Sequence, residues 1–210
     1  MQNIMPVDKA IISVSDKRCV EDLAKGLFEY NPNMEILSSS GTAKLLRDSG
    51  YQVTDISTYT GFPESPGGFV KTLHPKVHAG IMLDRDVEEH RRYMESIGAN
   101  SIGLIVINFY PLAKMIADGK TIEEIRVHGL DVGGPTMVSA AVKAYPSVAV
   151  VTNPDDYTVL LHELATIGGT SLGTRLELAK TAARAVADYD REKADFLKNL
   201  TTSEVSKIYL

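Results

Sequence analysis

The sequence predicts an α/β fold with a mostly parallel sheet. Short runs rich in β-branched residues alternate along the chain with stretches whose apolar residues recur at helical spacing. The strand predicted at 104–109 is apolar on both faces, as strands are when helices cover both sides of a parallel sheet. Because such sheets bind ligands beyond the carboxyl ends of their strands, chemistry is expected in the loops that follow strands.

In the first half of the chain, apolar runs predict strands at 10–14, 34–37, 53–56 and 77–83. Helical spacing and charge predict helices at 20–28, at 42–48 with an end at Gly50, and at 86–96. Between 58 and 75, glycine and proline interrupt every pattern, which predicts a long loop. Long loops in compact domains are often functional.

The second half of the chain continues the alternation and ends in a long helix. Strands are predicted at 104–109 and, as the last strand, at 148–151, and helices at 121–128, 135–144 and 154–165. Gly168 and Gly169 then break the pattern. From 171 to about 200 an apolar stripe predicts a helix that packs across the domain or against a second subunit; its members are Leu172, Leu176, Ala179, Ala183, Val186 and Tyr189. We therefore expect an α/β domain at 1–168 and a helical extension of the same domain at 169–210.

The composition excludes several classes of protein. The chain has 210 residues, enough for one sizeable domain or a domain with an appendage. Its net charge of −5 argues against broad binding of nucleic acid. The single cysteine, Cys19, excludes an internal disulfide and a zinc–thiolate cluster, and makes a reducing cytosol the default. No targeting segment is visible and the apolar runs fall far below the roughly 18 residues of a membrane helix, so we expect a cytoplasmic protein without a membrane partner.

Two loops after predicted strands suit an anionic group. Ser15 and Lys17 bring a hydroxyl and an ammonium to the end of the first strand, directly before a helix. After the second strand, small residues precede a helix near Thr42, whose first N–H groups and positive dipole end attract a phosphate. The alternative for both loops is helix capping with a solvated lysine. The residues alone leave both interpretations open.

A third loop concentrates cationic and protonatable groups. His74 and His78 are four residues apart, a spacing that would suggest a metal pair on a helix. Pro75 lies between them and argues against a regular helix, and no acidic residue stands where a zinc protease needs one. We therefore expect no metal site, although Lys71 and Lys76 make the segment basic within an acidic chain.

Three further positions carry candidate chemistry. Tyr110 follows a predicted strand, where it is either a core residue with a wet hydroxyl or a proton donor. Asp131 precedes Gly133 and Gly134, whose N–H groups form an oxyanion hole unless Asp131 simply caps the next helix. Lys143 lies in that helix among apolar residues, and it is either solvated at one edge or directed into a site.

Six motifs occur in one order, and each alone is weak: Ser13-Val14-Ser15-Asp16-Lys17, Gly41-Thr42-Ala43-Lys44, Thr60-Gly61-Phe62-Pro63-Glu64, Val70-Lys71-Thr72-Leu73-His74-Pro75, Asn108-Phe109-Tyr110-Pro111 and Asp131-Val132-Gly133-Gly134-Pro135. The ordered set is highly specific. From about residue 10 to about residue 200, the chain resembles the IMP cyclohydrolase domain of the bifunctional enzyme that ends purine biosynthesis.

The resemblance implies a fold and a reaction. The fold is the methylglyoxal-synthase-like three-layer α/β sandwich, here with a long C-terminal helix. The reaction closes the ring of 5-formamidoimidazole-4-carboxamide ribonucleotide, a purine nucleotide precursor, to IMP with loss of water, and it needs no metal or cofactor. A formyltransferase domain usually follows, so we expect a stand-alone cyclohydrolase, or a piece of the longer protein, that receives its formylated substrate from a separate protein. The long helix predicts a homodimer.

Matching motifs also imply the site residues. The catalytic set is Lys71, Tyr110, Asp131 and Lys143, and the nucleotide contacts are Ser15, Lys17, Ser39, Gly41, Thr42, Thr72, Asn108 and Gly133. In the expected mechanism, Asp131 takes the proton of the attacking amide nitrogen, with Lys143 as charge partner or proton relay. Lys71 and the N–H groups of the Gly133-Gly134 turn stabilise the formyl oxyanion, and Tyr110 donates a proton.

The sequence departs from the family pattern near the site. Ser40 stands where the family usually has glycine, and Phe69 where it usually has an arginine that is expected to help hold the nucleotide. Ala144 and Tyr145 replace the usual Asn-His after the lysine. Phe69 and Ser40 keep open a non-catalytic sensor of purine nucleotides, and the shared fold keeps open methylglyoxal synthase or another lyase. The Lys-Thr-Leu-His-Pro and Asp-Val-Gly-Gly-Pro motifs favour the cyclohydrolase.

Overall fold

A parallel sheet forms the centre of the molecule. The computed structural model describes residues 3–63 and 65–209, so Glu64 of the third motif lies outside the described residues. Within them, the strands lie in the order β4-β3-β2-β5-β6 and each is parallel to its neighbour. The order reverses between β2 and β5, so a crevice opens beyond their carboxyl ends, where sheets of this kind bind ligands. The strands are β2 (Lys9–Ser13), β3 (Glu35–Ser38), β4 (Val53–Asp55), β5 (Leu104–Ile107) and β6 (Ala149–Val151).

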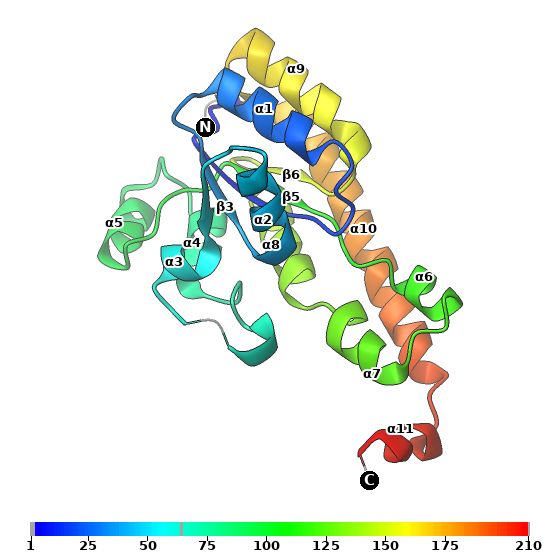
Figure 1. Ribbon diagram of the computed structural model, residues 1–210. Helices are drawn as coiled ribbons and strands as arrows, with labels where there is room; N and C mark the ends of the chain where they lie inside the picture. The colour runs from blue at the N-terminus through cyan, green and yellow to red at the C-terminus, as the bar shows by residue number, and fades with distance from the viewer. Residues whose placement is uncertain (1–2, 64, 210) are drawn as a thin grey trace.

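Helices cover both faces of this sheet (Figure 1). Successive strand residues point to opposite sides, so Ile12 of β2 joins one core cluster with Leu23 and Leu160, whereas Ile11 joins the other with Val138. The first cluster lies under α1 (Val20–Tyr30), α2 (Ser40–Asp48) and α9 (Tyr157–Ile167), and the second under α4 (Pro75–Met82), α8 (Gly133–Lys143) and α10 (Leu172–Lys198). This arrangement confirms the predicted three-layer α/β sandwich with a long C-terminal helix.

The predicted strand at 77–83 is wrong, because this segment is the helix α4. Pro75 occupies the first helical position, where the missing N–H of proline costs nothing. His74 caps the helix, and its Nδ1 accepts a hydrogen bond from the Lys76 N–H at 3.1 Å. The expectation that Pro75 prevents a regular helix was therefore also wrong, since proline disrupts a helix in its interior rather than at its start.

The helix α10 runs along the edge of the sheet beside β6 and α8 (Figure 1). Its buried residues are Arg175, Leu178, Ala179, Ala182 and Tyr189. The predicted stripe was partly wrong, because Leu172 and Leu176 are 41% and 37% exposed. A fully buried arginine, Arg175, takes the core side of the first turns instead.

Two short strands and several helices complete the described chain. β1 (Ile4–Met5) pairs antiparallel with β7 (Thr170–Ser171), so 148–151 does not hold the last strand as predicted. The predicted helix at 121–128 continues from an α-turn into a π-helical turn. No helix among the described residues is both long and apolar enough to span a membrane. The remaining elements are α3 (Ile56–Thr60), η1 (Pro66–Gly68), α5 (Glu88–Ser96), α6 (Leu112–Ala117), α7 (Ile122–Glu124), η2 (Ile125–Gly129), η3 (Pro154–Asp156) and α11 (Thr202–Tyr209).

Candidate active site

A cavity of about 770 Å³ lies beyond the carboxyl ends of β2 and β5. It gathers residues from five separate loops and helix ends, as the sheet order leads one to expect. All but one of the predicted site residues line it: Ser15, Lys17, Ser39, Gly41, Thr42, Lys71, Thr72, Asn108, Tyr110, Asp131 and Gly133. The exception is Lys143.

One end of the cavity is built from the loop after β2 and the start of α2. The Thr42 hydroxyl donates to the Val14 carbonyl at 3.0 Å and accepts from the Val14 N–H at 3.1 Å, which fixes the helix to this loop. Lys17 Nζ donates to the same carbonyl at 3.2 Å. A methyl group added at Gly41 would lie 3.7 Å from Lys17 Nζ, so the ammonium sits at the start of the helix. This end therefore combines a cation, hydroxyls and the positive end of a helix dipole.

Asn108 joins the loops after β5 and β2. Its Oδ1 accepts hydrogen bonds from the N–H groups of Ser15, at 2.6 Å, and Asp16, at 2.9 Å. Its Nδ2 donates to the Asp16 carbonyl at 3.0 Å. The amide oxygen and the amide nitrogen of Asn108 therefore both bind the backbone of the loop after β2, the strand next to β5. Asn108 shapes the cavity by holding the loop that carries Ser15.

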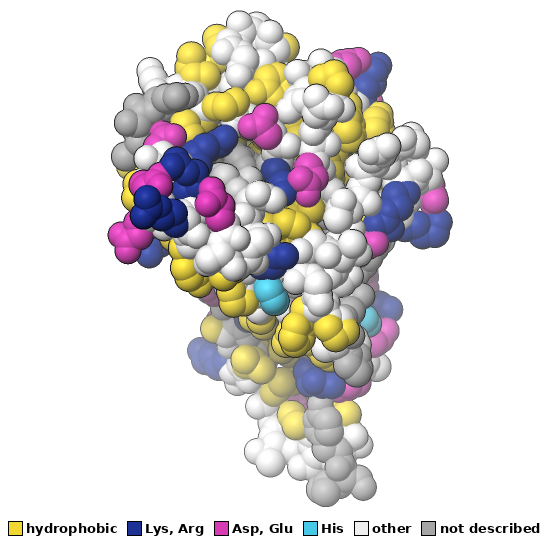
Figure 2. Space-filling model, turned by 90° about the vertical axis from the view of Figure 1, so that its left-hand side faces the viewer, with side chains coloured by type: hydrophobic (Ala, Val, Ile, Leu, Met, Phe, Trp, Pro, Cys, Tyr) yellow, Lys and Arg dark blue, Asp and Glu magenta, His cyan; other side chains and the backbone are white. Residues whose placement is uncertain are grey.

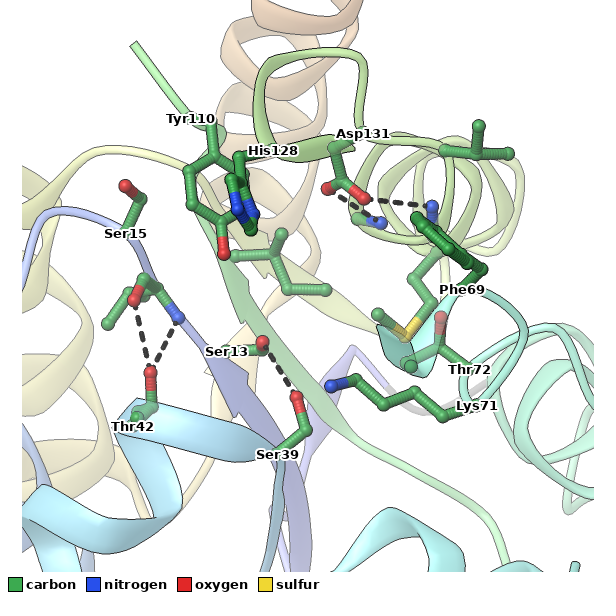
Figure 3. Close-up of a pocket in the computed structure, with 18 of the residues that line it drawn as sticks. Ser13, Ser15, Ser39, Thr42, Phe69, Lys71, Thr72, Tyr110, His128 and Asp131 are labelled. Carbon is green, nitrogen blue, oxygen red and sulfur yellow. Dashed lines mark hydrogen bonds between the residues drawn. The ribbon is translucent and has the colours of Figure 1, made fainter. Parts of the chain in front are cut away.

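Asp131 lies two residues before α8, and its side chain caps the first N–H groups of that helix. Oδ1 accepts from the Gly133 N–H and Oδ2 from the Gly134 N–H, both at 3.2 Å (Figure 3). The expected oxyanion hole from these two N–H groups is therefore wrong, since the Asp131 carboxylate already accepts both. The glycines allow this close approach, because a methyl group at Gly134 would lie 2.5 Å from Oδ2.

Lys71 and Thr72 form the opposite wall. Lys71 extends from its loop across the cavity toward Ser39 (Figure 3). A methyl group at Gly133 would collide with the Thr72 hydroxyl, so the start of α8 packs directly on this wall. Behind it, half-buried His78 hydrogen-bonds to the Thr72 backbone; burial lowers the pKa of His78 and outweighs that hydrogen bond. A neutral His78 therefore supports the segment that carries Lys71.

Lys143 does not reach this cavity. It is the exposed last residue of α8, whereas Gly133 is the first. Ten residues of α-helix separate them, which corresponds to about 15 Å. The predicted pairing of Lys143 with Asp131 is therefore not formed within one copy of the chain. Of the two interpretations of Lys143, the structure matches a lysine exposed to solvent.

Among the cavity residues outside the predicted set are two basic side chains and one aromatic ring. Arg126 and His128 come from the π-helical turn η2, and Phe69 comes from the long loop. Arg126 also pairs with Glu123, with Nη2 and Oε1 2.6 Å apart. The sequence signal that could have indicated Arg126 and His128 is their position as two basic residues shortly before the Asp131 motif. Phe69 is 54% exposed at the cavity and brings an apolar ring where the family usually has a cation.

Comparisons with known proteins match both halves of the chain. The family model of the MGS-like domain matches residues 20–136, and the family model of the AICARFT/IMPCHase bienzyme matches residues 141–209. The chain is similar to the bifunctional purine biosynthesis protein PurH of Persephonella marina, with 44% identity over 87% of this chain and 35% of that protein. PurH of Acidithiobacillus ferrooxidans is 42% identical over 92% of this chain and 37% of that protein. The chain thus spans about a third of the length of these relatives.

One solved structure matches almost end to end. The crystal structure of ForH superposes with a TM-score of 0.76 and 33% sequence identity. The match covers 91% of this chain and 99% of the ForH chain. The similarity therefore includes α10 as well as the central sheet.

Proposed function

We propose that the chain, which belongs to the family of MGS-like domains, is an IMP cyclohydrolase. It closes the ring of 5-formamidoimidazole-4-carboxamide ribonucleotide to IMP and releases water. The match to the AICARFT/IMPCHase bienzyme and the PurH relatives support this reaction over a lyase or a nucleotide sensor. The observation that carries the proposal is one cavity whose lining combines the anion-binding end beside α2 with Lys71, Tyr110 and Asp131.

The end beside α2 takes the phosphate of the nucleotide. Lys17 supplies the charge, and the first turn of α2 supplies N–H groups and the positive dipole end. Ser15 and Ser39 line the same end and add hydroxyl groups. Variants of Lys17 and Ser15 are therefore expected to raise KM more than they lower kcat.

Ring closure takes place beside Asp131 in the same cavity. The carboxamide nitrogen attacks the formyl carbon of the same molecule, so the cavity accelerates the reaction by holding the two groups together. Asp131 accepts the proton that the nitrogen loses as the new C–N bond forms. Its carboxylate offers about four lone-pair sites, of which the capping N–H groups use two. The remaining sites can face the substrate.

The formyl oxygen becomes an oxyanion as the bond forms. Lys71 stabilises this charge, and Tyr110, which is 45% exposed at the cavity, donates a proton to the oxygen. The resulting hydroxyl and the proton of the former formamide nitrogen then leave as water. The N–H groups of Gly133 and Gly134 act indirectly, by fixing Asp131.

The proposal extends to the setting of the reaction. We expect the protein in the cytoplasm and as a homodimer, and a formyl-transfer reaction must supply its substrate. The exposed leucines of α10, Leu172 and Leu176, offer apolar surface for a second copy. The oligomeric state in solution, measured by sedimentation, tests this part separately.

Incubation of the protein with the formylated carboxamide ribonucleotide tests the reaction. We expect IMP to form with saturation kinetics, which the rise in ultraviolet absorbance of the purine ring reports. Binding of IMP without turnover would instead identify a sensor. Release of methylglyoxal from dihydroxyacetone phosphate would identify a lyase.

Two variants test the assigned chemistry. We expect Asp131→Asn and Lys71→Ala each to lower kcat by at least about 100-fold, as for a general base and an oxyanion donor. IMP binding, measured by calorimetry, should show that the cavity stays intact. A wild-type rate in either variant removes that residue from the mechanism.

A further inference from the structure

Tyr189 of α10 touches two of the loops that build the cavity. Its hydroxyl accepts a hydrogen bond from the Asp131 N–H at 3.0 Å and donates one to the Gly129 carbonyl. Its ring stacks on Phe109, with 4.9 Å between the ring centroids. Phe109 lies between Asn108 and Tyr110, which line the cavity. One side chain therefore contacts both the Asp131 loop and the Tyr110 loop.

The surroundings of Tyr189 keep it fixed. The side chain is 4% exposed, and Lys193 Nζ lies 4.8 Å from the ring centroid. Burial raises the pKa of Tyr189 to about 12, so the hydroxyl stays protonated and keeps both its donor and its acceptor role. A phenol has one proton to donate, and here the Gly129 carbonyl takes it. The hydroxyl thus stays committed to the backbone of this loop.

We propose that Tyr189 is a positioning residue that holds the Asp131 carboxylate at a fixed position relative to Tyr110. This inference deepens the proposed cyclohydrolase function and rests on it. Tyr189 lies outside residues 20–136, so the helix that follows the MGS-like match completes the site. The separation of 58 residues between Tyr189 and Asp131 makes this a tertiary contact that local sequence does not encode.

The hydroxyl and the ring have different tasks. Loss of the hydroxyl alone frees the Asp131 N–H and the Gly129 carbonyl, so the loop before α8 relaxes and the carboxylate moves. The hydrogen bonds at the phosphate end beside α2 join Lys17 and Thr42 to Val14 and do not involve Tyr189, so this end keeps its geometry. The hydroxyl therefore affects kcat, whereas the ring acts on the loop of Phe109.

Two variants separate these tasks, and a third serves as control. Tyr189→Phe keeps the ring stack and removes the hydroxyl, whereas Phe109→Leu keeps the hydroxyl and removes the stack. Tyr157→Phe is the matched control: Tyr157 is also 4% exposed, and its hydroxyl has no hydrogen-bond partner among the described residues. Each variant is measured for kcat, KM, thermal unfolding and amide hydrogen exchange at Asp131 by NMR.

We expect Tyr189→Phe to lower kcat by about 10- to 100-fold, the effect of a small misplacement of a catalytic group. KM should stay near the wild-type value, and the Asp131 amide should exchange faster. In Phe109→Leu that amide should stay protected, because the hydroxyl still accepts its hydrogen bond. Tyr157→Phe should match the wild type in all of these measurements.

Several outcomes would overturn the proposal. They are wild-type kcat and exchange in Tyr189→Phe, the same loss in Tyr157→Phe, or equal exchange at Asp131 in Tyr189→Phe and Phe109→Leu. If Tyr189→Phe does not fold, rapid exchange at Asp131 in Phe109→Leu would overturn it. A wild-type protein without turnover would reject the cyclohydrolase function, while exchange at Asp131 would still decide whether Tyr189 fixes this loop.

Discussion

Asp131 combines a structural and a chemical task in one carboxylate. The Gly133 and Gly134 N–H groups donate hydrogen bonds to it, so it caps the start of α8. The same bonds fix the direction in which the free lone pairs point. Capping and catalysis are therefore compatible interpretations of one motif, and the glycines make them compatible because they leave room for the carboxylate.

Gly134→Ala tests this need for room. The new methyl group would lie 2.5 Å from Asp131 Oδ2, so the carboxylate must move. We expect kcat to fall by about 100-fold, as for a displaced catalytic group, and Tm to fall as well. Gly173→Ala in α10 is the control, because its methyl group would meet only Ser171 Oγ at 3.8 Å. It should leave kcat unchanged and should not lower the free energy of unfolding, because alanine has the higher helix propensity.

Unchanged turnover in Gly134→Ala would contradict the geometry given for Asp131. A similar loss in both alanine variants would point to a general effect on the fold rather than to the carboxylate. Turnover and thermal unfolding, measured on the same preparations, distinguish these outcomes.

The helix α7 carries a capping box that starts the turn leading to the cavity. Thr121 Oγ1 accepts from the Glu124 N–H at 3.1 Å, and Glu124 Oε2 accepts from the Thr121 N–H at 2.8 Å. The backbone of Thr121, Lys120 and the Thr121 hydroxyl together lower the pKa of Glu124 from 4.5 to about 2. The turn that follows brings Arg126 and His128 to the cavity.

The lowered pKa of Glu124 predicts a pH dependence of stability. The ionised carboxylate is favoured in the folded state, so its contribution is fully present above pH 4.5 and is lost as the pH falls toward 2. We expect Glu124→Gln to be less stable than the wild type at pH 6, and this difference to shrink as the pH falls through that range. Thermal unfolding between pH 2 and 6 measures it. A difference that stays constant with pH would show that the charge of Glu124 is not involved.

Patterns in the sequence predict the elements with one clear periodicity best. The strands at the centre and α1 appear at their predicted places because their apolar residues face one buried surface. The segment 77–83 contradicts the prediction because an apolar run of that length suits a strand and a helix equally. The buried side of α10 was predicted incorrectly because it contains Arg175, and a charged residue is taken as exposed when a helix is predicted from its apolar pattern.

The candidate site shows the same limit. Loops directly after strands were predicted, because a parallel sheet places them at one edge. Lys143 does not line the cavity of its own chain, because its distance from Asp131 depends on the helix between them rather than on the motif. Arg126, His128 and Tyr189 reach the cavity or its loops through a π-helical turn and a tertiary contact. Spacing along the chain reports neither.

The helix α10 contacts other parts of the chain at its start, along its middle and near its end. At its start, Arg175 donates to the Thr170 carbonyl and, at 3.4 Å, to the Asn3 carbonyl, beside the pairing of β1 with β7. Along its middle, α10 packs on β6 and α8. Near its end, Tyr189 reaches the Asp131 loop. These contacts support the prediction that 169–210 extends the same domain rather than forming another.

A pair of neighbouring alanines in α10 tests this unity. Ala182 is fully buried in the core cluster beneath α8, whereas the next residue, Ala183, is exposed. We expect Ala182→Leu to lower the free energy of unfolding by about 1–3 kcal/mol through overpacking, and Ala183→Leu to change it little. Each kcal/mol corresponds to about 2–4 °C in Tm for a chain of this size. If α10 is part of one cooperative domain, far-ultraviolet circular dichroism and hydrogen exchange of the β5 amides should report the same shift in Ala182→Leu. A shift confined to helical signal, with β5 protected as in the wild type, would show instead that α10 unfolds on its own.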